Sequence, residues 1–290
     1  IGPASARALK MGPKNNPGLN ENLAREVMEL HTLGVDGPYT QEDVTQLAEL
    51  FTGMSFQARN GFKFRKDYVE PGAETILGKT YPDAYNVEPV QAVLADLAAH
   101  PATMRHIAHK LAVHFTSDTP DADLVDKIEA AFARSGGDLM ALYEALLGHP
   151  SAWAPTLANY KPPIDFVSSA LRSLGVSPTA FDRLEEKQYR GFFAVRFNEM
   201  GQQWERPPGP DGWPEEDAEW ITPQGLTARV FWSMAIPVRL MGNALPDPRA
   251  FVETALGKHS SEAVRFAAAA AESKPEAIGL VLMSPAFQHR

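Results

Sequence analysis

The sequence NENLAREVMELHTLGV, residues 20–35, decides how this chain begins to fold. Its apolar residues recur at intervals of three and four, the spacing of a helix that packs one face against a core. Gly34 follows the last of them and is a typical helix stop. We therefore predict a helix over residues 20–33.

The sequence YTQEDV, residues 39–44, predicts where the next helix begins. Thr40 precedes Asp43 by three residues, and this spacing is typical of a capping box. The apolar residues that follow again share one helical face: Val44, Leu47, Ala48 and Phe51.

At 100° per residue, the apolar centre of the first helix is expected at Leu23, Val27 and Leu30. Glu26 then falls on one edge of that face and His31 on the other. A titratable group in this position is either a candidate for chemistry or a buried polar contact.

Other polar residues of the same helix join Glu26 in a candidate site. Asn22 and Glu29 fall on the same side as Glu26, and Arg25 lies one turn from both Glu21 and Glu29. A Glu–Arg–Glu ladder is therefore expected along the helix surface.

Two interpretations of this helix stay open. In the first, Glu26 is partly desolvated, has a raised pKa and acts as general acid/base or metal ligand with Glu29. In the second, Glu26 and His31 are buried polar groups that fix helix packing. Glu29 and His31 lie about 160° apart on an ideal helix, so they share a metal only if the helix unwinds near Thr32.

A second group of titratable residues is formed by histidines. His106 and His109 have the His-x-x-His spacing that can bind zinc on a helix, but the Glu of metalloprotease helices is missing. Exposed histidines on a polar helix face are the commoner outcome.

Helical patterns account for most of the remaining chain, so we predict a mainly α fold: a compact multi-helix array. Further helices are expected at residues 87–99, 101–116, 121–134, 138–148, 163–174, 178–189, 223–241, 248–256, 260–271 and 274–283. Residues 1–18 are expected to be a loop, residues 55–80 a small β-hairpin excursion, and residues 204–220 a loop rich in Pro and Trp. We predict one helical domain over residues 1–290.

Composition excludes several classes of function. The net charge of −9 disfavours nucleic-acid partners and anionic membrane surfaces. The chain has no cysteine, which excludes disulfides and thiolate chemistry. We find no apolar run long enough to cross a membrane, and no Gly-rich phosphate loop or Gly-x-Ser-x-Gly elbow. Membrane insertion and nucleotide-dependent chemistry are therefore not expected.

Motifs spread along the chain make it resemble the bacterial DUF1800 family, a family of unknown function. They lie at residues 20–35, 39–41, 51–53, 100–103, 115–118, 161–166, 201–202, 207–213 and 284–288. The resemblance implies that these residues are the C-terminal portion of a longer domain. It also implies a periplasmic or extracellular location, because family members often carry export signals.

One departure from the family pattern concerns the hairpin excursion. Where the family often has a His-Asp pair before a Pro-Gly turn, this chain has Val69 and Glu70, and a Lys often found after the turn is Glu74. If that pair served a metal site or proton transfer, this chain has lost it.

Two functions fit these observations. The first is an exported hydrolase whose polar cleft is built from Asn22, Arg25, Glu26, Glu29 and His31, with Glu26 as acid/base. Its substrate would be a carbohydrate or other neutral molecule, since the surface is acidic and tryptophans surround the proline loop. The alternative is a non-catalytic envelope or assembly protein that meets its own missing N-terminal segment or another protein chain. The residues identify no cofactor and no metal.

Overall fold

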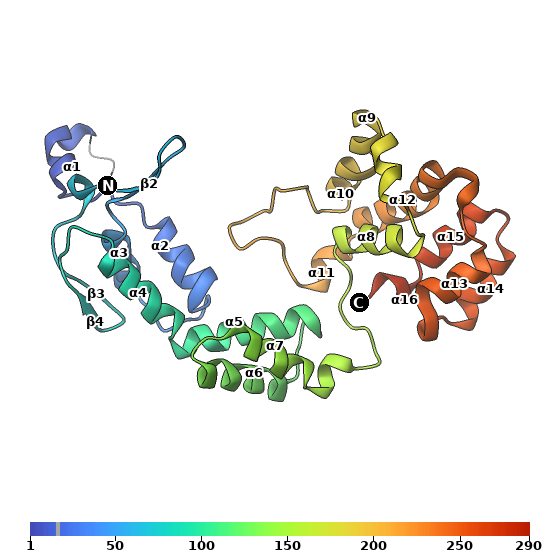
Figure 1. Ribbon diagram of the computed structural model, residues 1–290, viewed down its shortest axis with the longest axis horizontal. Coiled ribbons are helices and arrows are strands. Elements are labelled where there is room, and N and C mark those ends of the chain that lie inside the picture. Colours follow the sequence, from blue (N-terminus) through green and yellow to red (C-terminus); the bar gives the residue numbers. More distant parts are fainter. Residues whose placement is uncertain (16–17) are drawn as a thin grey trace. The chain divides into compact units, whose positions relative to one another are not determined.

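A computed structural model describes residues 1–15 and 18–290 (Figure 1). The chain divides into two compact units, which are described separately below. Unit 1 comprises Ile1–Ala112 and Asp121–Pro150, and unit 2 comprises Val113–Pro120 and Ser151–Arg290. The single domain over residues 1–290 stays a prediction.

Unit 1 is mainly helical, as predicted. Its helical elements are α1 (Ala6–Met11), η1 (Pro13–Asn15), α2 (Asn22–Glu26), η2 (Val27–Thr32), α3 (Gln41–Leu50), η3 (Lys66–Tyr68), α4 (Glu88–Ala98), most of α5 (Pro101–Phe115), α6 (Ala122–Ser135) and α7 (Leu139–Leu147). The excursion near residues 55–80 contains two antiparallel hairpins. They are β1 (Met54–Gln57) with β2 (Gly61–Phe64), and β3 (Glu74–Ile76) with β4 (Lys79–Tyr81).

Unit 2 is helical throughout its described elements. After η4 (Pro150–Trp153) these are α8 (Pro163–Ser173), η5 (Pro178–Arg183), α9 (Glu186–Tyr189), η6 (Arg190–Ala194), α10 (Val195–Glu199), α11 (Asp217–Trp220), α12 (Pro223–Met241), η7 (Gly242–Ala244), α13 (Pro248–Leu256), η8 (Gly257–His259), α14 (Glu262–Ala270), α15 (Lys274–Leu282) and α16 (Pro285–Gln288). Proline opens many of them, because its fixed φ suits the first helical turn and its missing N–H has no partner to lose there.

Each unit has its own hydrophobic core. In unit 1 the core lies between α2, α3 and α4, and the second hairpin covers it. The residues buried together in this core are Ala24, Met28, Leu33, Val44, Leu47, Ala48, Leu50, Phe51, Ile76, Tyr81, Val90, Val93 and Leu97. The capping box of Thr40 and Asp43 is present, and the predicted face of α3 is the one that packs into this core.

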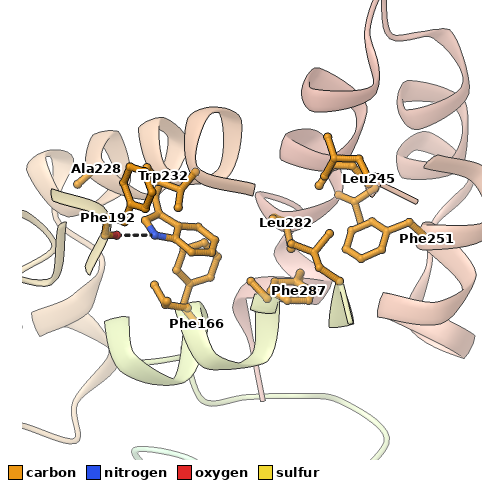
Figure 2. Packing of buried hydrophobic residues seen from close by; sticks show 14 of the residues in the cluster. Phe166, Phe192, Ala228, Trp232, Leu245, Phe251, Leu282 and Phe287 are labelled. Atoms are coloured by element: carbon orange, nitrogen blue, oxygen red, sulfur yellow. Dashed lines mark hydrogen bonds between the residues drawn. The ribbon is translucent and has the colours of Figure 1, made fainter. Parts of the chain in front are cut away.

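Aromatic rings dominate the core of unit 2, as Figure 2 shows. Phe166 of α8 meets Trp232 of α12 edge-to-face, with ring centroids 5.6 Å apart, and Phe287 of α16 at 6.2 Å. The indole N–H of Trp232 donates to the carbonyl oxygen of Phe192 at 3.1 Å, so this buried polar group is satisfied. Helices from both ends of unit 2 therefore share one core.

The structure corrects three predictions about local elements. The predicted loop over residues 204–220 ends in the short helix α11, Asp217–Trp220. The loop prediction for residues 1–18 is wrong for Ala6–Met11, which form α1 because the Ser5 hydroxyl caps it by accepting from the Ala8 N–H. Residues 16 and 17 lie outside the described part of the chain. The helix predicted over residues 178–189 is instead the 3₁₀ segment η5 followed by the short helix α9.

Within residues 1–15 and 18–290, no helix combines the length and apolar character that a membrane span requires.

Candidate functional site

The predicted first helix changes its hydrogen-bonding pattern halfway. Asn22–Glu26 form the α-helix α2, and Val27–Thr32 continue as the π-helix η2. The Leu33 N–H donates to the Met28 carbonyl at 2.8 Å, a bond across five residues. π-helical turns are rare and occur often at functional sites.

The π-turn also changes which side chains face the core. Met28 and Leu33, five residues apart, are both buried, and Ala24 is buried one turn before Met28. The predicted apolar centre is wrong for Leu23, which is exposed. Leu23 lies in the α-helical part, where its neighbour Ala24 faces the core instead. The wider turn that follows brings Leu33 round to the side of Met28.

The end of η2 lies against helix α5. His106 Nε2 is 3.3 Å from the Leu30 carbonyl oxygen, and burial lowers the pKa of its imidazole. Gly34 has a positive φ of 91°, and a Cβ placed there would be 3.0 Å from His106 Nδ1. Gly34 therefore meets two demands at once: the left-handed backbone and the close approach of α5.

Arg25 takes part in a network between α2 and α3. It donates to Gln41 Oε1 at 2.5 Å and lies 3.8 Å from the Glu21 carboxylate. Glu21 also accepts from Thr45 Oγ1 at 2.8 Å and Gln41 Nε2 at 2.7 Å, and these two bonds lower the pKa of its carboxyl. Half of the predicted ladder, Glu21 with Arg25, is thus present, and Arg25 joins two helices.

The other four candidate residues lie on the same stretch with different exposure. Glu26 and Glu29 are half-buried, whereas Asn22 and His31 are exposed. Glu29 lies close to Tyr39, whose pKa is raised by burial first and by the negative charge of Glu29 second. The assignment of a catalytic site to these residues stays a prediction.

Sequence reasoning missed a second group of titratable residues, a carboxylate cavity in unit 1. Glu74 on β3 is only 5 % exposed, and burial raises the pKa of its carboxyl to about 7. Glu49 of α3 lines the same small cavity of about 10 Å³, and burial together with the neighbouring Glu70 raises its pKa. A cavity of this size holds about one water molecule.

Positions where this chain departs from the family pattern lie at the same cavity. Glu70 also lines the cavity; its carboxylate accepts from the Ala4 N–H at 2.8 Å, and its own N–H donates to Thr52 Oγ1 at 2.7 Å. Val69 is buried beside Gly53. The positions where the family often has His, Asp and Lys therefore lie around one enclosed cavity.

Metal binding was left open by the sequence. Among the residues the structure describes, no group of three or more His, Asp or Glu side chains is arranged to hold a metal ion. His106 and His109, the zinc candidates, belong to the same helix, but His106 contacts the carbonyl of Leu30.

In unit 2, the proline loop bounds an open cleft of about 400 Å³. We call it the proline-loop cleft, and its lining residues are Asn198, Gly201, Gln203, Arg206, Pro208, Trp213, Pro214, Glu219 and Trp220. Trp220 is buried and its ring centroid lies 6.4 Å from that of Trp213, so it anchors the loop. The turn between Gly209 and Gly212 closes on itself through an antiparallel bridge.

Several motif residues of unit 2 hold the fold together. Lys161 Nζ donates to the Phe287 carbonyl at 2.6 Å, and burial lowers the pKa of Lys161 to about 8. Buried Arg229 donates to Gln288 Oε1 at 2.8 Å and to the Lys161 carbonyl at 2.7 Å. Gln202 Oε1 accepts from the Ile164 N–H at 2.8 Å, at the start of α8.

Three further clefts can be compared with the predicted site. They are the carboxylate cavity, a groove beside Arg196 and Phe231, and a groove between α6 and α7 beside His149. Neither these three nor the proline-loop cleft is lined by the five predicted residues Asn22, Arg25, Glu26, Glu29 and His31.

Comparisons with known proteins bear on the family of this chain. No curated protein and no solved structure matches it. The model of one protein family, described as "Protein of unknown function (DUF1800)", matches residues 6–289. That match covers nearly the whole chain, so the protein belongs to the DUF1800 family.

Proposed function

We propose that this protein binds a neutral saccharide in the proline-loop cleft. The observation that carries the proposal is the composition of that cleft: an indole ring, Trp213, surrounded by polar side chains in an open space of about 400 Å³. An aromatic ring offers a flat apolar surface to the C–H groups of a sugar, while amides and charged groups bond its hydroxyls.

The charges of the cleft favour a neutral ligand. Arg206 and Glu219 contribute one positive and one negative group, and Asn198 and Gln203 contribute uncharged amides that both donate and accept. Such a set suits hydroxyl groups, which also donate and accept, better than it suits a phosphate or a carboxylate.

The restricted backbone of the proline loop also favours binding of a ligand in this cleft. Four prolines between residues 207 and 214 restrict the backbone, and the stacked pair of Phe197 and Trp204, 6.2 Å apart, packs beside its start. A loop that is ordered before binding loses less entropy when the ligand arrives.

The test is a binding assay with soluble neutral oligosaccharides, for example cello-, xylo- and malto-oligosaccharides, followed by calorimetry. We expect Trp213→Ala to weaken binding by about tenfold or more, since aromatic anchors dominate such interfaces. Trp153→Ala is the matched control, because Trp153 is an exposed tryptophan of unit 2 outside the cleft.

Because Trp213 also packs near Trp220, a second variant separates binding from folding. Asn198→Ala removes only an amide from the cleft and is expected to weaken binding with unchanged thermal unfolding. The proposal fails if no sugar of the panel binds, or if both cleft variants bind like the wild type.

We also propose a catalytic role for the first helix, with Glu26 as acid/base, Glu29 as partner carboxylate, and Asn22, Arg25 and His31 as supporting groups. What favours it is the π-helix beginning at Val27, directly after half-buried Glu26. The same sugars, assayed for new reducing ends, test it: Glu26→Gln should abolish release, whereas Glu42→Gln on the exposed side of α3 should not.

The outcomes of the two assays are distinguishable. Binding without release of reducing ends would reject catalysis and leave a non-catalytic envelope protein that holds a saccharide. Release that is unchanged in Glu26→Gln would reject the assignment of the acid/base.

We further propose that the protein works in the periplasm or outside the cell. This rests on the family resemblance alone. Fractionation of cells that express this protein from its natural gene tests it, and recovery from the cytoplasm alone would reject it.

A further inference from the structure

The first hairpin of unit 1 ends in an uncovered aromatic pair. Phe56 of β1 and Phe62 of β2 are directly opposite each other in the antiparallel register and are 76 % and 58 % exposed. Met54 and Phe64 form another opposite pair on the same face, nearer the base, and are half-buried. The apolar face of the hairpin is therefore packed at its base and bare at its tip.

Basic side chains are concentrated in the hairpin and in the N-terminal segment. In residues 1–15 and 54–66 every charged side chain is basic, although the whole chain carries a net charge of −9. These side chains are Arg7, Lys10, Lys14, Arg59, Lys63, Arg65 and Lys66. All of them except half-buried Arg65 are exposed.

The two basic segments are connected through η3, at the base of the hairpin. Helix α1 packs against η3, which follows β2 directly, and the Gly2 N–H donates to the Tyr68 carbonyl at 2.9 Å. Figure 1 shows the β1–β2 hairpin extending from the body of unit 1. Leu9 of α1 adds a third large apolar side chain that is 71 % exposed.

We propose that α1 and the tip of the β1–β2 hairpin dock on an anionic lipid bilayer. We call these residues, 6–15 and 54–66, the basic hairpin surface. Phenylalanine and leucine side chains enter the boundary between headgroups and acyl chains, while surrounding lysines and arginines attract anionic headgroups. The basic hairpin surface is positively charged, although the chain as a whole is negatively charged. We therefore expect its partner to be anionic.

The choice of lipid over single-stranded nucleic acid rests on the kind of apolar group. Nucleic-acid platforms use aromatic faces on which bases stack. The basic hairpin surface adds an aliphatic side chain, Leu9, which gives a base no ring to stack on but partitions readily into a bilayer. The two phenylalanines also form a single tip, as insertion requires, instead of a row along a groove.

The test is flotation of the protein with vesicles of phosphatidylcholine, with and without phosphatidylglycerol, over a series of salt concentrations. We expect binding only with phosphatidylglycerol, and weakening with salt because headgroup charges are screened. Phe56→Ser with Phe62→Ser should weaken binding by about tenfold or more, because the loss of two phenyl groups removes the inserted area.

Two controls make the result specific. Phe266→Ser changes a phenylalanine of unit 2 that is 73 % exposed, and it should bind vesicles like the wild type. Arg59→Glu with Lys63→Glu changes only exposed charges and should also weaken binding, by about 25-fold or more, since each basic group near an anionic bilayer contributes about fivefold. Because these two charge substitutions leave both phenylalanines in place, they test lipid binding even if the serine substitutions disturb the folding of the hairpin.

Insertion itself can be followed at one position. The chain has no cysteine, so Ala58→Cys at the hairpin tip takes an environment-sensitive label at a single site. We expect its emission to shift to shorter wavelength with anionic vesicles. Binding that is equal in all variants, absent with phosphatidylglycerol, or stronger for a single-stranded oligonucleotide than for vesicles would overturn the proposal.

Discussion

Glu74 is the carboxyl group of this chain whose surroundings differ most from water. It is buried on β3 at a cavity that Glu49 and Glu70 also line, and its pKa of about 7 lies well above the ordinary value of 4.5. The cause is first burial, which disfavours the charged form, and then the repulsion of neighbouring carboxylates.

This pKa makes the stability of unit 1 depend on pH. The folded state holds a proton on Glu74 that the unfolded state loses above about pH 4.5, so stability falls as pH rises from about 4.5 to 7. The loss is about 3 kcal/mol at most. Denaturant unfolding at pH 5 and pH 8 measures it. Glu74→Gln should remove most of this difference and be more stable than the wild type at pH 8, whereas exposed Glu42→Gln should leave it unchanged.

Gly34 allows a second test at the scale of single residues. Gly34→Ala should destabilise the protein by about 2 kcal/mol, because alanine resists a φ of 91° and its Cβ would meet His106 Nδ1 at 3.0 Å. Gly136→Ala is the matched control: its φ of 68° is also positive, but a Cβ there would meet no atom within 4 Å. Equal losses in thermal unfolding of the two variants would show that contact with His106 costs nothing.

Among the elements, the start of α3 depends on one aspartate. Asp43 Oδ2 accepts from the Thr40 N–H at 2.8 Å and the Thr40 hydroxyl at 2.7 Å, and Oδ1 accepts from the Leu77 N–H at 2.7 Å. Burial alone would raise the pKa of Asp43, but these hydrogen bonds outweigh it and lower the pKa. One side chain thus caps α3 and holds the turn between β3 and β4.

Asp43→Ala should therefore cost more than the loss of an ordinary cap. Substitution of a cap residue costs about 1 kcal/mol, and we expect about 2–3 kcal/mol here because the Leu77 N–H also loses its partner. Thr40→Ala, which leaves the bond to Leu77, should cost about 1 kcal/mol. Chemical denaturation of both variants measures the difference, and equal losses would contradict the double role of Asp43.

The elements also show what the sequence could predict. The capping box, the packed face of α3 and most long helices were predictable, because caps and apolar spacing are local signals. The π-helix Val27–Thr32 was not, since apolar residues spaced three and four apart suit an α-helix equally well. That change of turn brings Leu33 to the side of Met28, although Leu33 was not among the residues predicted to be central.

For the candidate sites too, local sequence patterns were predictable and contacts between distant residues were not. The sequence identified the polar residues of the first helix and the tryptophans of the proline loop, because both are contiguous in the chain. It could not identify the carboxylate cavity, where Glu49 of α3 meets Glu74 of β3 through tertiary packing. The net charge of the whole chain did not predict the basic hairpin surface either. That net charge is −9, yet residues 1–15 and 54–66 contain no Asp or Glu.

For the whole molecule, the open question is whether the two compact units unfold together. The single-domain prediction expects one calorimetric transition whose van't Hoff and calorimetric enthalpies agree. Met28→Ala in the core of unit 1 and Ile278→Ala in the core of unit 2 should then lower the same transition temperature. Two transitions, each shifted by only one of these variants, would show that the units are separate domains.

The core of unit 2 has a consequence for how the chain matures on the ribosome. Ile278, Val281, Leu282 and Phe287 are buried in the same cluster as Phe166, more than a hundred residues earlier. The hydrogen bond from the guanidinium of Arg229 to Gln288 likewise cannot form before Gln288 has been synthesised. Synthesis runs from the N-terminus, so unit 2 cannot complete its core until residues 278–288 have left the exit tunnel. Until then the apolar side chains of this cluster stay partly exposed on the nascent chain.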